Sequence, residues 1–279
     1  MPEWLRVKVR KSSLGKETSA RLARHGVSTV CANAKCPNIG ECYHSGTATF
    51  LLMGERCTRG CRFCAVDGGP PEALDPTEPQ RVAAAARELA LSHVVITSVT
   101  RDDLPDGGAA HIATTVRAVR EALTEATIEV LVPDFLGDEA AVHAVVEAGL
   151  DVFNHNVETV PRLYPEVRPG ADYGRSLHVL AHAHALAPDM PTKSGIMLGL
   201  GEEYEEVLQV MDDLRGVGCE FLTLGQYLQP SPRHLPVARF VPPQEFEEFG
   251  QAARKKGFAF VASAPFVRSS YRAHEALGG

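Results

Sequence analysis

Long hydrophobic runs are missing from this sequence of 279 residues. No apolar stretch approaches the about 18 residues that a membrane-spanning helix requires, which argues against a transmembrane segment. The first residues, MPEWLRVKVRKSS, also lack the apolar stretch of a signal peptide, and Glu3 and Glu17 argue against a transit peptide. We therefore expect a cytoplasmic protein that has no membrane partner and whose cysteines stay reduced.

Aromatic residues are scarce, at 6% of the chain, and no stripe of mixed basic and aromatic residues is present. Because the formal net charge is also -7, the sequence predicts no nucleic-acid partner. The basic charge gathers at the beginning, where residues 1–25 carry seven Lys and Arg against two acidic residues. Such a basic arm suits an acidic partner, and its other interpretation is a solvated extension.

Internal repeats and low-complexity tracts are absent, whereas short apolar runs alternate with longer amphipathic segments. The short runs are rich in β-branched and apolar residues and are bounded by turn residues, which predicts strands. They are TFLLMG (49–54), HVVITSV (93–99), TIEVLVP (127–133), DVFNHNV (151–157), TKSGIML (192–198) and EFLTLGQ (220–226). The segments between them have helical spacing, and several end at glycine. They are EPQRVAAAARELALS (78–92), GAAHIATTVRAVREALTE (108–125), GDEAAVHAVVEAG (137–149), GRSLHVLAHAHALA (174–187) and EEYEEVLQVMDDLRGVG (202–218).

Six alternations of strand and helix predict an α/β fold, a partial (β/α)6 TIM-type barrel with a parallel sheet. We expect three segments that form one structural unit: an N-terminal cysteine-bearing extension with the basic arm (1–48), the barrel (49–230) and a C-terminal extension (231–279). In such a fold the chemistry gathers at the carboxyl ends of the strands. The polar stretches TSVTRDDLPDGG, NHNVETV and GQYLQPS each begin at such an end.

Six of the seven cysteines occur in two triplets, CANAKCPNIGEC (31–42) and CTRGCRFC (57–64). A closed zinc site requires four ligands, and no fourth cysteine follows either triplet at a short spacing. Three thiolates can instead hold three irons of a cubane cluster and leave the fourth iron open for a substrate or cofactor. The C-x3-C-x2-C spacing after the first strand therefore favours an iron–sulfur cluster over structural zinc.

CTRGCRFC, with the aromatic Phe63 before its last cysteine, matches the cluster motif of radical S-adenosylmethionine enzymes. Together with the first triplet, TSVTRDDLPDGG, FNHNVETVPRLYPEVRPGADY, TKSGIMLGLGE, GQYLQPSPRHLPV and the terminal RSSY, the sequence resembles the lipoyl synthase family. The resemblance runs from about Trp4 to Tyr271, which is nearly the whole chain.

The resemblance implies two 4Fe–4S clusters. One is held by Cys57, Cys61 and Cys64, and its open iron binds S-adenosylmethionine, which is cleaved to a 5′-deoxyadenosyl radical. The other is an auxiliary cluster on Cys31, Cys36 and Cys42, with Ser270 of RSSY on its fourth iron and Ser269 close by. An oxygen ligand fits poorly beside soft thiolates, which suits an iron that must leave.

The implied reaction is the radical insertion of two sulfur atoms at C6 and C8 of a protein-bound octanoyl-lysine. It uses two S-adenosylmethionine molecules and sacrifices the auxiliary cluster as the sulfur source. The implied partners are octanoylated lipoyl carrier domains, namely 2-oxoacid dehydrogenase E2 subunits and the glycine cleavage H protein. Others are an electron donor such as flavodoxin or ferredoxin and an iron–sulfur carrier that repairs the cluster. Arg6, Lys8, Arg10 and Lys11 are candidates for docking the carrier.

Phe63 of the cysteine motif and polar residues at or near the strand ends are the candidates for binding S-adenosylmethionine. They are Phe63, Thr97, Ser98, Asn154, Asn156, Glu158, Arg168, Lys193, Gln226 and Tyr227. Each has a second interpretation as a loop or capping residue, and Arg168 as an anchor of its own loop. RDDLPDGG is interpreted as a turn before a helix, His178, His182 and His184 as a solvated helix face, and Cys219 as a buried small side chain. The alternatives are an enzyme similar to biotin synthase and a zinc-stapled binding module.

Overall fold

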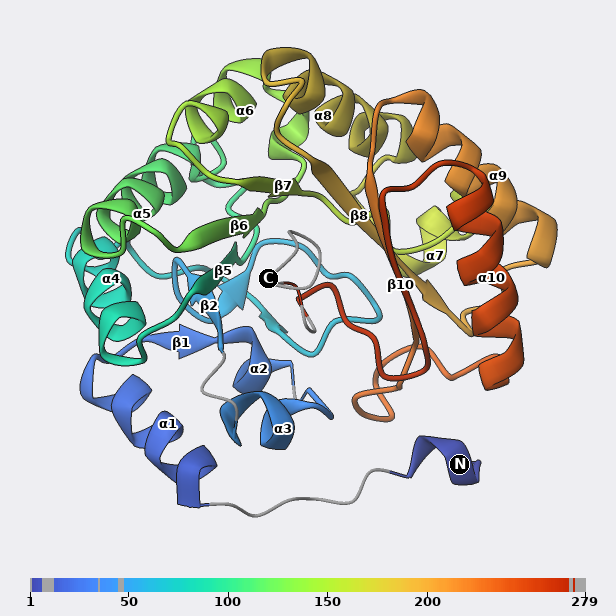
Figure 1. Cartoon of the computed structure of the whole chain (residues 1–279), viewed down its shortest axis with the longest axis horizontal. Coiled ribbons are helices and arrows are strands. Elements are labelled where there is room, and N and C mark those ends of the chain that lie inside the picture. The colour runs from blue at the N-terminus through green and yellow to red at the C-terminus, as the bar shows by residue number, and fades with distance from the viewer. Residues whose placement is uncertain (1, 7–12, 35, 45–47, 271–272, 274–279) are drawn as a thin grey trace. The chain divides into compact units, whose positions relative to one another are not determined.

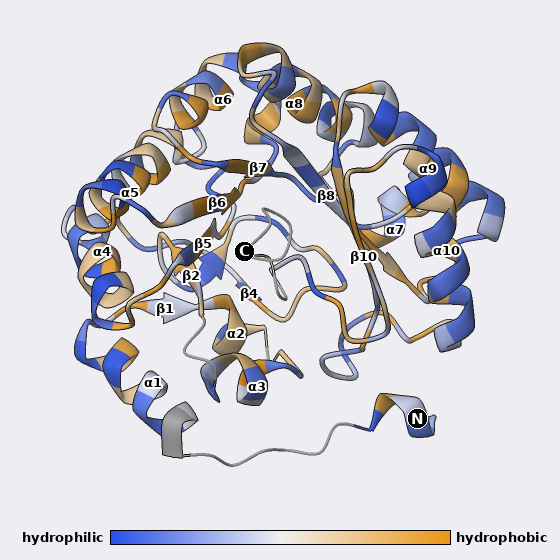
Figure 2. Cartoon of the chain, in the orientation of Figure 1, coloured by the Kyte–Doolittle hydropathy of each residue, from blue (hydrophilic) through white to orange (hydrophobic). Residues whose placement is uncertain are grey.

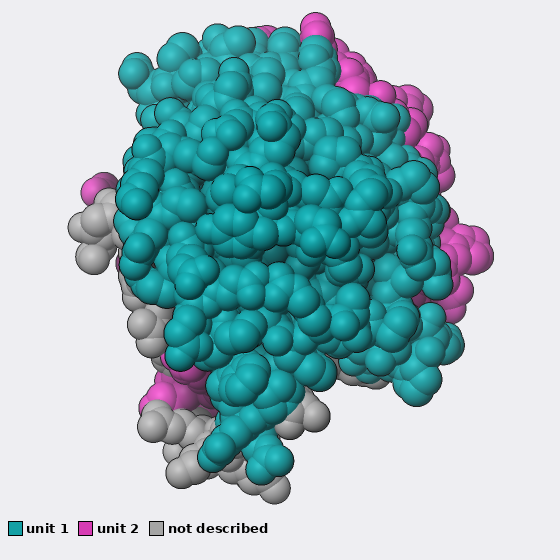
Figure 3. Space-filling view, turned by 90° about the vertical axis from the view of Figure 1, so that its right-hand side faces the viewer, with its two compact units in different colours: residues 1–7, 60–65, 153–279 teal, residues 8–59, 66–152 magenta. Residues whose placement is uncertain are grey.

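The computed structural model describes residues 2–6, 13–34, 36–44, 48–270 and 273. The chain divides into two compact units, shown in Figure 3. Unit 1 comprises residues 1–7, 60–65 and 153–279, and unit 2 comprises residues 8–59 and 66–152. The three segments expected from the sequence stay a prediction.

Unit 2 contains a sheet in the order β1-β2-β5-β6, in which β2, β5 and β6 are parallel and β1 is antiparallel to β2. The strands are β1 (Ser28–Thr29), β2 (Thr49–Leu52), β5 (His93–Ser98) and β6 (Thr127–Leu131). Their helices are α4 (Glu78–Glu88), α5 (Ala109–Ala122) and α6 (Glu139–Val146), which form one row beside the strands (Figure 1). The alternation of apolar residues therefore builds the parallel β/α repeats that the sequence predicts.

The core of unit 2 is apolar, because the strands carry long β-branched and aromatic side chains between the helices and the sheet. Phe50, Ile96 and Ile128 are fully buried, as are Val82 of α4 and Val116 of α5. Asp138 caps α6, because its side chain accepts a hydrogen bond from the backbone N–H of Ala140. An N-cap of this kind stabilises a helix by about 1 kcal/mol.

Unit 2 also contains further elements outside this sheet. They are α1 (Ser13–Arg24), α2 (Val30–Asn33), α3 (Ile39–His44), η2 (Phe135–Gly137) and a two-stranded ladder of β3 (Arg56–Cys57) and β4 (Asp67–Gly68). α1 packs against α3, and the hydroxyl of Thr18 donates to the backbone oxygen of Tyr43 at 2.8 Å. These elements carry the first cysteine triplet and the first cysteine of the second.

Unit 1 continues the same pattern with the parallel strands β7, β8, β9 and β10. Their bounds are β7 (Val152–Asn154), β8 (Thr192–Leu198), β9 (Phe221–Gln226) and β10 (Phe260–Ser263). The helical segments are η1 (Glu3–Leu5), η3 (Pro161–Leu163), α7 (Tyr164–Val167), α8 (Tyr173–Leu186), α9 (Tyr204–Gly216) and α10 (Pro243–Lys255). The six expected strands and five expected helices are thus confirmed, with shifts of a few residues at their ends.

The strands of unit 1 bury polar residues. Figure 2 shows β8 as hydrophilic over part of its length, whereas β6 of unit 2 is coloured hydrophobic. Thr192, Lys193 and Ser194 of β8 are fully buried, and so is Asn154 of β7. Burying polar groups costs free energy unless they form hydrogen bonds. The buried polar residues of β8 are therefore candidates for a functional role.

Candidate functional site

The first cysteine triplet is held by two short helices of unit 2. Cys31 lies in α2, Cys42 in α3, and Cys36 in the loop between them, where its N–H donates to the backbone oxygen of Cys31 at 3.1 Å. Thr29 caps α2, and its hydroxyl is 2.8 Å from that of Tyr43. This local structure brings three residues spaced over twelve positions into one small region.

Tyr43 is buried beside the first cysteine triplet, and all three thiols act on the pKa of its phenol. Burial raises its pKa, its hydrogen bond to Thr29 lowers it, and the charges of Cys31, Cys42 and Cys36 each raise it further. Burial also raises the pKa of the Cys31 thiol, while hydrogen bonds from Thr49 lower it. Thiolates are soft ligands, so three of them suit an iron centre.

The second triplet lies on a loop, and its first cysteine belongs to unit 2. Cys57 ends β3, and its backbone oxygen accepts from the N–H of Gly69 at 3.3 Å. Thr58 donates from its N–H and its hydroxyl to the oxygen of Thr100, at 3.1 and 2.9 Å. Arg59 directs its backbone N–H to Cys57 Sγ at 3.4 Å and pairs with Asp102 and Asp134.

The other two cysteines of this loop belong to unit 1 and have their own supports. The N–H of Arg62 donates to the oxygen of Val167 at 2.9 Å, and the N–H of Leu235 donates to the oxygen of Arg62 at 3.1 Å. His234 places Nε2 at 2.9 Å from the backbone oxygen of Cys64, and Ser231 Oγ is 2.8 Å from His234 Nδ1. Polar contacts to segments distant in sequence thus hold a loop that has no helix of its own.

None of the seven cysteines, all of which the structure describes, forms a disulfide, as ligands for iron require. Among the residues that the structure describes, no three His, Cys, Asp or Glu side chains gather as they would around a single metal ion.

Thr97 and Ser98 end β5 in unit 2, as expected. The hydroxyl of Thr97 donates to the oxygen of Leu131 at 3.0 Å and so ties β5 to β6. The Oγ of Ser98 is buried, and it has no hydrogen-bond partner within the described part of the chain. An unsatisfied buried hydroxyl at a strand end fits a polar group of a ligand.

In unit 1, Asn154 and Asn156 hold the C-terminal segment. Asn154 Nδ2 donates to Ser269 Oγ at 2.8 Å, and Ser269 Oγ donates to Asn156 Oδ1 at 3.1 Å. Asn156 also donates to Glu158 Oε1 at 3.1 Å. Glu158 has a positive φ of 66°, and burial raises the pKa of its carboxyl group, while Arg168 and Asn156 lower it.

Arg168 anchors its surroundings, as one of its two interpretations expected. Its Nη1 donates to the backbone oxygens of Asn156 and Val157 at 3.0 and 3.1 Å, and its guanidinium lies over the ring of Tyr164. The buried Nε of Arg168 has no hydrogen-bond partner among the described residues. Burial lowers the pKa of Arg168, but the charges of Tyr164, Glu158 and Cys61 raise it overall.

The remaining candidates are Gln226 and Tyr227 at the end of β9, Lys193 near the start of β8 and Phe63 in the cysteine loop. Gln226 donates to the oxygens of Leu198, Tyr227 and Arg239 and accepts from the N–H of Val241 at 2.8 Å. Tyr227 donates to the oxygen of Leu235 at 2.7 Å, and burial raises its pKa to about 12. Lys193 is fully buried in β8, and Phe63 is half-buried. Their contacts with S-adenosylmethionine stay predictions.

The C-terminal segment, residues 264–270, passes very close to β9. The N–H of Ala264 donates to the oxygen of Leu224, and the N–H of Gln226 donates to the oxygen of Pro265, both at 3.2 Å. A Cβ at Gly225 would lie 2.0 Å from the oxygen of Val267, so only glycine fits there. Because Ser269 is bound by the two asparagines, the half-buried Ser270 is the serine left for another partner. Tyr271 lies outside the described residues.

Two further groups have the structural roles that the sequence predicted, a turn and a buried small side chain. Asp106 of RDDLPDGG accepts from the N–H groups of Gly108 and Ala110 at the start of α5, which confirms a turn before a helix. Cys219 is fully buried, and burial raises the pKa of its thiol to about 12.

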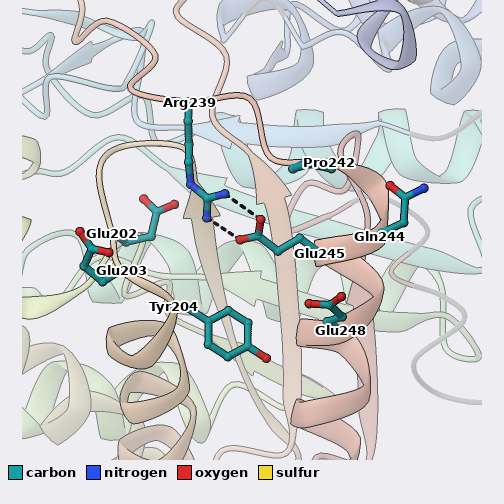
Figure 4. Close-up of a pocket in the computed structure, with 8 residues that line it drawn as sticks. All are labelled: Glu202, Glu203, Tyr204, Arg239, Pro242, Gln244, Glu245 and Glu248. Carbon is teal, nitrogen blue, oxygen red and sulfur yellow. Dashed lines mark hydrogen bonds and ion pairs between the residues drawn. The ribbon is translucent and has the colours of Figure 1, made fainter.

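A pocket of about 550 Å³ lies in unit 1 between the starts of α9 and α10 (Figure 4). Arg239 and Glu245 form a two-pronged ion pair across it, at 2.7 and 2.5 Å. Its lining residues are Glu202, Glu203, Tyr204, Arg239, Pro242, Gln244, Glu245 and Glu248. It contains no cysteine and none of the residues expected to bind S-adenosylmethionine.

Arg6 of the basic arm is exposed, while Lys8, Arg10 and Lys11 lie outside the described residues. None of the helices that the structure describes combines the length and the apolar character of a membrane span.

Sequence reasoning missed the residues that support the cysteines: Tyr43, Arg59, Asp102, Asp134 and His234. An arginine inside a cluster loop and aspartates just after strands are weak signals, because surface turns contain the same residues. Their partners become visible only when the strand ends are brought together.

Comparison with known proteins agrees with this arrangement. Residues 51–214 match the Radical SAM superfamily. The chain is 55% identical over 276 residues to a lipoyl synthase from Caldanaerobacter subterraneus subsp. tengcongensis, which covers 99% of this chain and 96% of that one.

Two solved structures show the fold. The FeFe-hydrogenase maturase HydG from Carboxydothermus hydrogenoformans is similar with a TM-score of 0.60 and 12% identity, over 96% of this chain and 71% of that one. Streptococcus suis SuiB bound to S-adenosylmethionine has a TM-score of 0.58 and 11% identity, over 78% of this chain and 50% of that one. These similarities confirm the partial (β/α) barrel, and the match to the superfamily implies a 4Fe–4S cluster and S-adenosylmethionine. The chain therefore belongs to the lipoyl synthase family of radical S-adenosylmethionine enzymes.

Proposed function

We propose that this chain inserts two sulfur atoms at C6 and C8 of an octanoyl-lysine on a lipoyl carrier domain. The observation that carries the proposal is the presence of two separate cysteine triplets without disulfides, one on and between α2 and α3 and one on the loop after β2. The similarity to a lipoyl synthase over nearly the whole chain supports it. One cluster serves the radical chemistry, and the second supplies the sulfur.

Cys57, Cys61 and Cys64 would hold the 4Fe–4S cluster that binds S-adenosylmethionine. When bound, this cluster supplies the electron that splits S-adenosylmethionine into methionine and a 5′-deoxyadenosyl radical. Ser98, with its unsatisfied hydroxyl, is the best candidate in unit 2 for a polar contact with S-adenosylmethionine. In unit 1 the candidates are Glu158 and Arg168, whose charges face each other.

Cys31, Cys36 and Cys42 would hold the auxiliary 4Fe–4S cluster, with Ser270 as the oxygen ligand of the fourth iron. The hydrogen bonds of Ser269 to Asn154 and Asn156 favour Ser270 over Ser269 for this role. Within the first triplet Cys31 is buried, whereas Cys36 and Cys42 are partly exposed.

The partners in this proposal are octanoylated E2 subunits of 2-oxoacid dehydrogenases and the glycine cleavage H protein. Flavodoxin or ferredoxin would supply electrons, and an iron–sulfur carrier would rebuild the auxiliary cluster. The exposed Arg6 and the rest of the basic arm would dock the carrier. A cytoplasmic location belongs to the same proposal, because thiols that bind iron must stay reduced.

Anaerobic metal and sulfide analysis tests the proposal. Reconstituted protein should contain about eight irons and eight labile sulfides per chain, as two cubane clusters require. An enzyme similar to biotin synthase would lack the cluster on Cys31, Cys36 and Cys42, and a zinc-stapled module would be colourless. With an octanoyl-lysine peptide, S-adenosylmethionine and a reductant, the product should be the lipoyl peptide. A chain that bound zinc alone would overturn the proposal.

A further inference from the structure

Arg59 lies between the first two cysteines of the second triplet, and its side chain is only 6% exposed. Its Nε and Nη2 donate to the two oxygens of Asp102 at 2.7 and 2.9 Å, and Nη2 also donates to Asp134 Oδ1 at 2.6 Å. Burial lowers the pKa of Arg59, but its hydrogen bonds to the two carboxylates and their charges raise it overall. A buried guanidinium is stable only with such partners, and the two-pronged bond to Asp102 fixes its orientation.

The two carboxylates follow neighbouring strands of unit 2 and are themselves held firmly. Asp102 lies in the loop after β5, and its N–H donates to Thr58 Oγ1 at 3.1 Å. Asp134 follows β6, is fully buried, and also accepts from the N–H of Leu136 at 3.1 Å. Leu136 lies in a left-handed turn, with a φ of 53°, so this hydrogen bond helps to hold a conformation that most residues avoid.

The backbone of Arg59 faces the cluster ligand. Its N–H points to Cys57 Sγ at 3.4 Å, while its side chain is bound to the loops after β5 and β6. Because one residue makes both contacts, fixing the guanidinium limits where the N–H can lie relative to the sulfur. Hydrogen bonds to cysteine sulfurs are among the factors that set the reduction potential of iron–sulfur clusters.

We propose that Arg59 is a positioning residue, which uses Asp102 and Asp134 to hold its N–H on the sulfur of Cys57. This inference depends on the proposed role of the second triplet. Loss of the anchor should loosen Cys57 and lower the reduction potential of the cluster, since a sulfur without its N–H donor stabilises the added electron less well.

The chain provides a matched control in the neighbouring residues. Arg101 is also buried, and it makes the same two-pronged bond to Asp103, at 2.9 and 2.8 Å. The side chains of Asp102 and Asp103 are 27% and 36% exposed, so their loss should disturb solvation to a similar degree. Asp103 differs from Asp102 in that its arginine is not part of the cysteine loop.

The test uses full-length protein in which Cys31, Cys36 and Cys42 are alanine, so that each chain carries one cluster. Asp102→Ala and Arg59→Lys are compared with Asp103→Ala and Arg101→Lys, since lysine keeps the charge but not the two-pronged geometry. The measurements are iron per chain, the rate of iron loss to a chelator, the EPR spectrum of the reduced cluster and its potential by redox titration. Thermal unfolding of all four variants reports any general loss of stability.

Asp102→Ala and Arg59→Lys should lose iron to the chelator on the order of 10-fold faster than the parent, with a changed EPR spectrum and a lower potential. Both controls should match the parent in spectrum and potential, even where their unfolding temperature falls. If Asp102→Ala and Arg59→Lys also kept the parental spectrum and potential, the positioning role would be overturned. If the controls changed as much as the test variants, the ion pair would be merely structural, which overturns the inference as well.

Failure of the proposed role of the second triplet gives a different result. In that case the parent itself would bind no iron after reconstitution, before any change at Arg59 or Asp102. If Arg59→Lys did not fold, Asp102→Ala alone would decide, because it leaves Arg59 its bond to the buried Asp134.

Discussion

Cys31, Cys36 and Cys42 lie on and between two short helices, whereas Cys57, Cys61 and Cys64 lie on a loop that begins in one compact unit and continues in the other. The first triplet is organised by neighbours in sequence, such as Thr29 and Tyr43. The second depends on residues far along the chain, such as Asp134 and His234. A cysteine motif can therefore be local in sequence and still rely on the whole fold for its geometry.

The two triplets also differ in how their fourth ligand would be supplied. We propose that the second leaves one iron open for S-adenosylmethionine and that the first receives Ser270. The C-terminal segment that carries Ser270 is fixed by Asn154, Asn156 and the close passage at Gly225. The following predictions test the differences between the triplets and the path of the C-terminal segment.

The largest effect is expected from removal of a whole triplet. Changing Cys57, Cys61 and Cys64 together to alanine should abolish cleavage of S-adenosylmethionine and leave about four irons per chain. The same change at Cys31, Cys36 and Cys42 should preserve cleavage and abolish the lipoyl product. Iron analysis and chromatography of 5′-deoxyadenosine check both, and 5′-deoxyadenosine from the first variant would contradict the assignment.

A smaller effect is expected from the serine of the first cluster. Ser270→Ala should leave cleavage of S-adenosylmethionine intact and lower the ratio of lipoyl product to 5′-deoxyadenosine about tenfold in a single turnover, by analogy with the loss of other metal-site partners. Ser270→Cys should keep the cluster but slow the release of its iron, because thiolate binds more tightly. Ser269→Ala is the control. If only Ser269→Ala lowered the ratio, Ser269 would be the ligand.

The path of the C-terminal segment gives a prediction about stability. Gly225→Ala places a Cβ 2.0 Å from the oxygen of Val267, and relief of this clash should cost about 2 kcal/mol of the free energy of unfolding. Gly216→Ala is the control, because a Cβ at Gly216 meets no atom within 4 Å. Urea unfolding of the cluster-free protein measures both. Equal stability of the two variants would show that the segment does not follow this path.

The smallest effect concerns thiol reactivity in the cluster-free protein. The pKa of Cys219 is raised to about 12, so at pH 8 this thiol stays protonated and should react slowly, with a rate that increases as the pH rises toward that value. Cys31 should also react slowly because it is buried, whereas the half-buried Cys57, Cys61 and Cys64 should react quickly. Mass spectrometry of the labelled peptides assigns each rate. Rapid labelling of Cys31 would contradict the predicted difference in reaction rate between Cys31 and the second triplet.

Much of the fold could be predicted from the sequence, because its signals are local. β8 runs from Thr192 to Leu198, as the apolar run predicts, and α5 and α9 lie within the segments with helical spacing. The additional strand β10 was expected only as part of a C-terminal extension, and its parallel pairing with β9 is visible only in the structure. Several strands begin or end one to three residues away from the positions that the sequence predicts, since hydrogen bonding rather than residue type decides where a strand stops.

The cysteines of the candidate site could be predicted from the sequence, whereas the residues that hold them in place could not. The sequence by itself determined the two cysteine spacings, the family and the alternation of strand and helix, because these depend on residues close together in the chain. Only the tertiary structure decided that Arg59 pairs with Asp134, 75 residues away, that Asn154 binds Ser269, 115 residues away, and that His234 contacts Cys64, 170 residues away. The reason is that a parallel β/α fold brings successive strand ends to one edge, so distant loops become neighbours whose side-chain pairing no local pattern encodes.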